Sequence, residues 1–194
     1  MKMRVISLLA AVLFLGNWQV KAQESFHLVA DKSSAEVDGT STLHDWNMKT
    51  TDLKCAAVME MDGTVVNNIE NVAFSCPAKS LKSHESSMMD KKAYKAIKSD
   101  KHPEILFTSD KVENLESNGN EFSGDLVGKL QLVGVTKTIK IPFKGKVTDA
   151  SHAVVNGSFK LKMSEYGIEQ VTAMLGAIKT GDDLTIKYNF ELGK

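Results

Sequence analysis

The sequence has 194 residues, 25% of them charged, with 24 lysines and arginines against 24 aspartates and glutamates. This length suits one domain with a proper hydrophobic core and is short for two. Arg4 is the only arginine, so the rest of the chain lacks the planar guanidinium groups that grip phosphates and bases bidentately. The composition therefore argues against a nucleic-acid-binding function.

Residues 1–22 have the pattern of a secretory signal peptide. Lys2 and Arg4 precede an almost entirely apolar segment, residues 5–18, and small residues at the end of the leader fit cleavage before position 23. The apolar segment is short for a membrane span and no second one follows it, which makes an uncleaved anchor the weaker alternative. We therefore expect one mature domain, residues 23–194, that is periplasmic or secreted and has no transmembrane anchor after cleavage.

Short apolar segments separated by turn residues occupy the first half of this domain. We expect strands around residues 25–31, 34–40, 53–61 and 70–78. Two aspartate–glycine pairs, Asp38-Gly39 and Asp62-Gly63, are typical of turns. The second pair is expected to join the last two strands into a hairpin.

The two cysteines, Cys55 and Cys76, both belong to the mature domain. In an oxidising compartment such a pair commonly forms a disulfide. If Met59 pairs with Val72 in the hairpin, the cysteines lie directly opposite each other, at the roughly 4.5–5.5 Å separation that a disulfide can span. The sequence therefore predicts a Cys55–Cys76 disulfide. Two free, buried cysteines are the alternative, because a buried cysteine is often simply a small apolar residue.

Residues 86–99 break the strand pattern and predict an amphipathic helix. Ser86 or Ser87 can cap its N-terminus. One face is apolar and the other carries lysines: Met89, Ala93, Ala96 and Ile97 against Lys91, Lys92, Lys95 and Lys98. Pro103 then takes the chain out of the helix and into the next strand.

The second half of the domain alternates apolar and polar residues with a period of two, which is typical of half-buried strands. We expect strands around residues 104–115, 121–133, 139–143, 155–163 and 184–190. Turn residues separate strands at Asn118-Gly119-Asn120 and Gly181-Asp182, and Asn156-Gly157 is a possible bulge. Pro142 lacks a backbone donor, so its strand is expected to meet a seam or an edge there.

These elements make an all-β domain with one covering helix. A mostly antiparallel sheet is best closed as a barrel, because closure removes exposed strand edges. A two-sheet sandwich is the alternative, since periodicity alone does not separate the two architectures.

The residues that enzymes and metal sites need are not arranged as such sites require. The chain has no G-x-S-x-G elbow of a serine hydrolase. His44 and Asp45 are neighbours in sequence, and neighbouring strand residues point to opposite faces, so they would not readily share a proton or a metal. The remaining histidines, His27, His84, His102 and His152, have no metal-ligand spacing. We therefore expect no catalysis, no metal and no cofactor.

Several short segments resemble, in order, those of the YceI-like family. They are Ser41–Trp46 (STLHDW), Met88–Tyr94 (MMDKKAY), His102–Ser109 (HPEILFTS), Gly124–Leu126 (GDL), Val133–Lys137 (VGVTK), Tyr166–Ile168 (YGI) and Gly181–Ile186 (GDDLTI). Each is weak alone, but together they span essentially the whole mature chain. The resemblance implies an extended lipocalin-like barrel of about eight strands with a helical cover, whose interior accommodates polyisoprenoid or other long amphiphilic chains.

On this reading the protein binds, sequesters or transports an isoprenoid or other long-chain lipid, such as a quinone or polyprenol, as cargo inside the barrel. The residues expected to line the interior are mainly aromatic residues and methionines: Trp46, Met59, Met61, Phe74, Met89, Tyr94, Phe107, Phe122, Leu126, Phe159 and Met163.

A second hypothesis is an envelope interaction or structural protein with a solid barrel and a surface loop that binds an envelope protein partner. Residues 164–180 carry apolar side chains without strand alternation, so they could be that loop or a lid over the barrel mouth. A ligand-filled interior predicts a cavity continuous with this segment, whereas a solid core predicts none.

Overall fold

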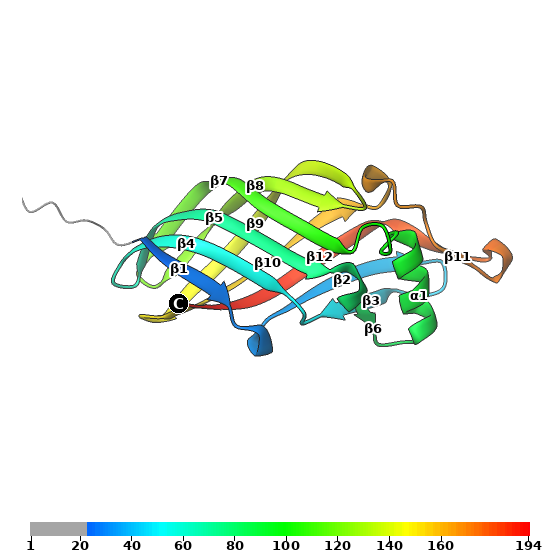
Figure 1. The fold of residues 1–194 in the computed structure, drawn as a ribbon, viewed down its shortest axis with the longest axis horizontal. Helices are drawn as coiled ribbons and strands as arrows, with labels where there is room; N and C mark the ends of the chain where they lie inside the picture. Colours follow the sequence, from blue (N-terminus) through cyan, green and yellow to red (C-terminus); the bar gives the residue numbers. More distant parts are fainter. Residues whose placement is uncertain (1–22) are drawn as a thin grey trace, which may run out of the picture.

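The computed structural model describes residues 23–194 (Figure 1). The predicted signal peptide, residues 1–22, lies outside the described residues. In the part of the chain that is described, no helix is long and apolar enough to cross a lipid bilayer.

Eight antiparallel strands form a closed ring. In spatial order they are β1 (Gln23–Leu28), β4 (Lys54–Asp62), β5 (Val65–Pro77), β7 (Glu104–Asn118), β8 (Glu121–Leu132), β9 (Val135–Asp149), β10 (His152–Lys162) and β12 (Ile178–Gly193). The ring closes where β1 pairs with the end of β12, His27 opposite Gly193 and Leu28 opposite Leu192. The predicted all-β barrel is confirmed, and the two-sheet sandwich is not the fold of this chain.

One half of β12 has a different partner. From Leu184 to Asn189 it pairs with β2 (Ser34–Ser41). In the same sheet β2 pairs with β3 (Trp46–Thr50), and β3 pairs with β6 (Lys82–Ser83). The 3₁₀ turn at Ala30–Lys32 separates β1 from β2. The barrel is therefore closed at one end and extended at the other by three additional strands (Figure 1).

The helix α1 (Ser87–Ala96) lies across this extended end (Figure 1). The hydroxyl of Ser86 caps it by accepting a hydrogen bond from the backbone N–H of Met89 at 3.3 Å, as residues of this type do at helix N-termini. The predicted helix and its serine cap are confirmed. Short 3₁₀ turns at Ala78–Ser80, Ser164–Tyr166 and Met174–Gly176 and the two-residue strand β11 (Thr172–Ala173) complete the fold.

The strand β9 is paired with β10 over only part of its length. The pairing runs from Asp149 opposite His152 to Lys144 opposite Asn156 and stops there. Pro142 lies just beyond that point, as expected for a residue without a backbone donor. The Tyr188 hydroxyl reaches across from β12 and donates to the Pro142 carbonyl at 2.9 Å, so a side chain bridges the seam between the two strands.

Three of the glycine-containing pairs were predicted wrongly as turns or bulges. Gly39 lies within β2, and a Cβ atom there would be 2.2 Å from Cζ2 of Trp46. Gly157 pairs regularly with Tyr188, whose hydroxyl would be 2.4 Å from its Cβ. Gly181 lies in a register shift within β12, not in a turn. The first two glycines make room for an aromatic ring on the neighbouring strand. The turns at Gly63 and Gly119 are confirmed.

The predicted disulfide is wrong, because the hairpin register differs from the expected one. The turn between β4 and β5 is tight, with Asp62 opposite Val65, and two register shifts along the hairpin then bring Cys55 opposite Phe74. Cys76 pairs instead with Ile105 of β7. Both cysteines are free thiols.

The close approach of Trp46 to β2 gives a stability prediction. We expect Gly39→Ala to lower the free energy of unfolding by about 1–3 kcal/mol, because the added methyl group must displace the indole ring or the strand. Gly119→Ala is the control: nothing lies within 4 Å of its Cβ position, so it adds only the strain of a positive φ. Urea denaturation measures both. A Gly39→Ala loss no larger than that of Gly119→Ala would contradict the packing described here.

Candidate ligand-binding cavity

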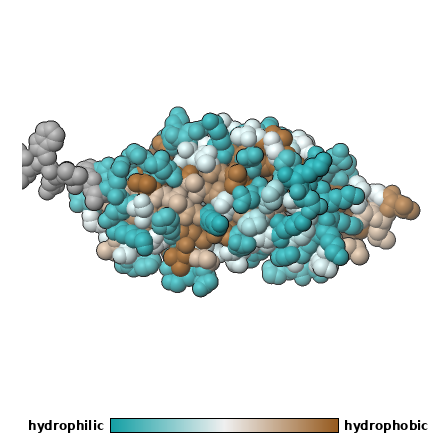
Figure 2. Space-filling view, in the orientation of Figure 1, coloured by the Kyte–Doolittle hydropathy of each residue, from teal (hydrophilic) through white to brown (hydrophobic). Residues whose placement is uncertain are grey.

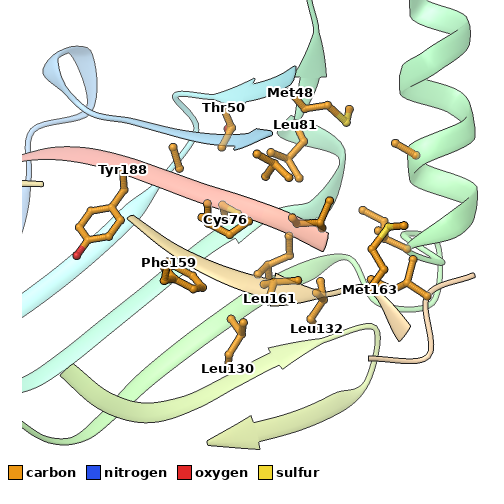
Figure 3. Close-up of a pocket in the computed structure, with 18 of the residues that line it drawn as sticks. Met48, Thr50, Cys76, Leu81, Leu130, Leu132, Phe159, Leu161, Met163 and Tyr188 are labelled. Atoms are coloured by element: carbon orange, nitrogen blue, oxygen red, sulfur yellow. The ribbon is translucent and has the colours of Figure 1, made fainter. Parts of the chain in front are cut away.

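The interior of the barrel holds a cavity of about 430 Å³ that extends to the α1 end. The alternation of the strands builds it, because every second side chain points inward. On β12 these are Leu184, Ile186, Tyr188, Phe190 and Leu192, and on β10 they are Val155, Phe159 and Leu161. Figure 3 shows Phe159 and Leu161 pointing into the same space as Leu130 and Leu132 of β8.

The interior is not filled by its own side chains. Two packed apolar clusters occupy it, one around Phe26 and Val147 and the other around Phe107 and Met163. Four side chains that contact both clusters are only partly buried: Phe74, Ile105, Leu126 and Tyr188. An inward-pointing side chain that stays partly exposed faces open space. The cavity therefore lies between and beside the two clusters, and the solid core of the alternative hypothesis is wrong.

The polar groups along the interior are already paired within the protein. The Thr50 hydroxyl lies 2.7 Å from that of Ser80, and the Trp46 indole N–H donates to the Thr40 carbonyl at 2.9 Å. The Tyr94 hydroxyl donates to the Leu81 carbonyl at 2.7 Å. Among the described residues, the one buried side-chain polar atom without a partner is the Tyr166 hydroxyl, and Tyr166 does not line the cavity. The deep wall thus offers a ligand hydrocarbon and no free hydrogen-bonding group.

Both cysteines line this wall and are chemically quiet there. Burial raises the pKa of the Cys55 thiol to about 12. Burial, and then the nearby carboxylates of Asp52 and Glu104, raise the pKa of the Cys76 thiol to about 12 as well. Because the nucleophile is the thiolate, protonated thiols of this kind are inert at neutral pH and act as small apolar residues.

Charged residues meet the cavity only at its mouth, within the part of the chain that the structure describes. They are His44, Glu85 and Lys92. His44 Nδ1 lies 3.5 Å from Glu85 Oε1, and both side chains are about half exposed. These residues come from the loop after β2, the segment before α1 and α1 itself, which together with β11 surround the opening.

Ten of the eleven residues predicted to line the interior are brought together around the cavity: Trp46, Met59, Phe74, Met89, Tyr94, Phe107, Phe122, Leu126, Phe159 and Met163. Met61 is not among the lining residues; it is the last residue but one of β4 and packs against the cluster around Phe26. That a ligand contacts any of these residues stays a prediction.

Sequence reasoning missed two sets of lining residues. Ile186 and Tyr188 belong to the strand predicted at residues 184–190, and its period-two alternation could have identified them as inward-pointing residues. The mouth residues Leu43, His44 and Glu85 lie in irregular segments, where no periodicity indicates which way a side chain points. Across residues 23–194, no three histidine, cysteine or acidic side chains lie together in a way that could hold a metal ion.

Comparisons with known proteins place this barrel in a family. The model of the YceI-like domain matches residues 18–192. The chain belongs to the YceI-like family. A sequence search of curated proteins gives no match.

Solved structures with the same fold come from several bacteria. BcnA of Burkholderia cenocepacia is 14% identical, with a TM-score of 0.65 over 84% of this chain and 98% of that one. A polyisoprenoid-binding domain from Saccharophagus degradans is 12% identical, with a TM-score of 0.66 over 87% and 97%. The YceI protein of Campylobacter jejuni is 21% identical, with a TM-score of 0.54 over 71% and 80%. At these identities, the structural similarity establishes that this chain has the same fold as the three solved proteins.

The buried thiols give a pH prediction. Alkylation of the folded protein at pH 8 should be on the order of a thousand times slower than that of an unperturbed cysteine, because the thiolate fraction falls tenfold for each unit of raised pKa. In denaturant without reductant, both thiols should react. Failure of both to react there would show a disulfide and contradict the structure.

The same pKa shift predicts how stability depends on pH. The folded state holds the two thiol protons more tightly than the unfolded state does, so this contribution to stability is present below about pH 9 and is lost as pH rises towards about 12. The Cys55→Ala/Cys76→Ala variant should lose this part of the pH dependence. Denaturation curves across this range measure it, and identical pH profiles for the two proteins would refute it.

Proposed function

We propose that this protein binds a long-chain isoprenoid or similar amphiphilic lipid inside the barrel, and sequesters or carries it without catalysing a reaction. The observation that carries the proposal is the cavity itself, whose wall is mainly apolar and whose charged side chains lie at its mouth. A volume of about 430 Å³ lies within the range of small-molecule sites. Each methylene group buried there contributes about 0.8 kcal/mol.

The distribution of polar groups supports a particular orientation of the ligand. A quinone or alcohol end buried at the closed end would lose its hydrogen bonds to water and find no free donor, which costs free energy. At the mouth it would meet His44, Glu85, Lys92 and water. We therefore place the hydrocarbon chain inside and the polar end at the opening.

The relatives support the same class of ligand. The Saccharophagus degradans structure is that of a polyisoprenoid-binding domain, and this chain shares its fold. We also propose that the protein acts in the periplasm or outside the cell, because residues 1–22 have the composition of a cleaved signal peptide.

A cavity-filling variant tests the proposal. Leu161 is a partly buried lining residue on β10, and Leu161→Trp adds a large ring to the cavity. We expect it to weaken binding of a long-chain polyprenol by about tenfold or more, since the ring takes space from the lipid and each displaced methylene group forfeits about 0.8 kcal/mol. Titration followed by native mass spectrometry measures the bound fraction.

Lys160→Trp is the matched control, because Lys160 is the exposed neighbour of Leu161 on the outer face of the same strand. It should bind as the wild type does. Equal affinity of the two variants would show that the lipid lies elsewhere. Failure of the wild type to take up any polyprenol or long-chain quinone would overturn the proposed function.

A further inference from the structure

The exposed apolar side chains gather at the mouth of the cavity. Among residues 23–194, four large hydrophobic residues are exposed: Leu43 (66%), Met88 (66%), Met174 (75%) and Leu175 (110%). Leu43 and Met88 also line the cavity, and Met174 follows the lining residue Ala173. Figure 2 shows the turn between β11 and β12 as a brown projection at the α1 end. Isolated exposed apolar residues are ordinary, but their concentration at one opening marks an interaction site.

These residues lie on three segments that are tied together. Thr42 N–H donates to the Lys179 carbonyl at 2.9 Å, and the Thr42 hydroxyl donates to the Ala177 carbonyl at 3.2 Å. These bonds join the loop of Leu43 to the turn of Met174 and Leu175. The 3.5 Å contact between His44 Nδ1 and Glu85 Oε1 brings the same loop against the segment before α1. The four apolar side chains therefore belong to one rim around the opening.

The backbone of the β11–β12 turn holds its side chains outward. Met174, Leu175 and Gly176 have successive positive φ angles of 49°, 56° and 93°. For a methionine and a leucine this conformation is unfavourable, and nothing inside the protein covers the Leu175 side chain. The fold thus maintains a strained turn that presents two large apolar groups to the outside.

The charge around the rim is positive, although residues 23–194 hold 24 acidic against 21 basic side chains once Lys2, Arg4 and Lys21 are removed. Lys91 and Lys95 on α1 and Lys98 just after it are exposed, and Lys92 of α1 lines the opening. In the described part of the chain none of these four forms an ion pair, whereas many lysines on the barrel wall do, such as Lys140 with Glu113 and Lys187 with Asp38. Of the nearby acidic groups, Glu85 lies at the mouth beside His44, and Asp90 is buried and faces Lys82.

We propose that this rim docks onto the surface of a lipid bilayer that carries anionic headgroups. Leu43, Met88, Met174 and Leu175 insert between the headgroups, and the α1 lysines contact lipid phosphates. Interfacial binding combines buried apolar area with electrostatic attraction in this way. The inference rests on the proposed function: with the opening against the bilayer, a lipid passes between membrane and cavity without its hydrocarbon chain crossing water.

Vesicle flotation tests the docking. The full mature protein is mixed with phosphatidylcholine vesicles with or without phosphatidylglycerol. We expect the wild type to float with the anionic vesicles, less so as salt is raised, because salt screens the lysines. Met174→Asp/Leu175→Asp should reduce the bound fraction about tenfold, since it removes the apolar insertion and adds repulsive charge.

The control is Thr64→Asp/Asn118→Asp. It adds the same charge at two exposed positions, one in the β4–β5 turn and one at the end of β7. These hairpin ends lie at the end of the barrel away from α1 (Figure 1), so the variant should float as the wild type does. Absence of wild-type binding to anionic vesicles, or equal loss in both double variants, would overturn the docking surface. If the wild type does not bind anionic vesicles, a protein partner is the alternative occupant of this rim.

Uptake of polyprenol separates this inference from the proposed function. Supplied from a dilute ethanol stock, polyprenol should load both wild type and Met174→Asp/Leu175→Asp equally, but from donor vesicles the variant should load more slowly. Flotation without any polyprenol uptake would refute the carrier function and leave the docking standing. Uptake from vesicles at the same rate by both proteins would refute the docking and leave the carrier function standing.

Discussion

The strand β12 pairs with two different partners along one edge, and the rest of the structure depends on that change of partner. Near its end it closes the ring with β1, and from Leu184 to Asn189 it pairs with β2 instead. Closure joins the first and last strands of the ring, β1 and β12, and so removes the two free edges that an open sheet of these strands would have. At the other end β2, β3 and β6 extend the sheet, α1 lies across the opening, and the strands' own side chains leave a cavity.

The chemistry of the wall follows from the same geometry. Period-two alternation delivers apolar side chains to the inside on each strand that lines the cavity, and the few inward polar groups pair with nearby backbone or side-chain oxygens, as the hydroxyl of Tyr188 does with Pro142. Charge is confined to the mouth, where segments without alternation meet. A site of this kind distinguishes the two ends of an amphiphile, and burial keeps the two thiols of its wall, Cys55 and Cys76, protonated.

Features of the fold and the cavity could be predicted from the sequence where a local pattern of residues determines them. The alternating strands, the helix with its Ser86 cap and ten lining residues came from periodicity and family resemblance, and the structure brings those ten residues together. The register of the β4–β5 hairpin could not be predicted in this way, because a tight turn and two register shifts place Cys55 opposite Phe74. Gly39 and Gly157 were misread because a glycine that admits an aromatic ring from the next strand has the same local sequence signature as a turn. The cavity is continuous with residues 164–180, as a hollow barrel predicted, through Ile168, Val171 and Thr172. Leu43, His44 and Glu85 at the mouth were missed because loops carry no period.

The central claim is that the hollow, hydrocarbon-lined barrel holds a lipid in its natural setting. The most direct measurement is native mass spectrometry of the protein purified from its own host cells, followed by organic extraction and identification of whatever accompanies it. The account predicts about one long-chain isoprenoid or similar lipid per chain, released only when the barrel unfolds or solvent extracts it. A chain that is recovered bare under the same gentle conditions, and stays bare when offered envelope lipids, would contradict it.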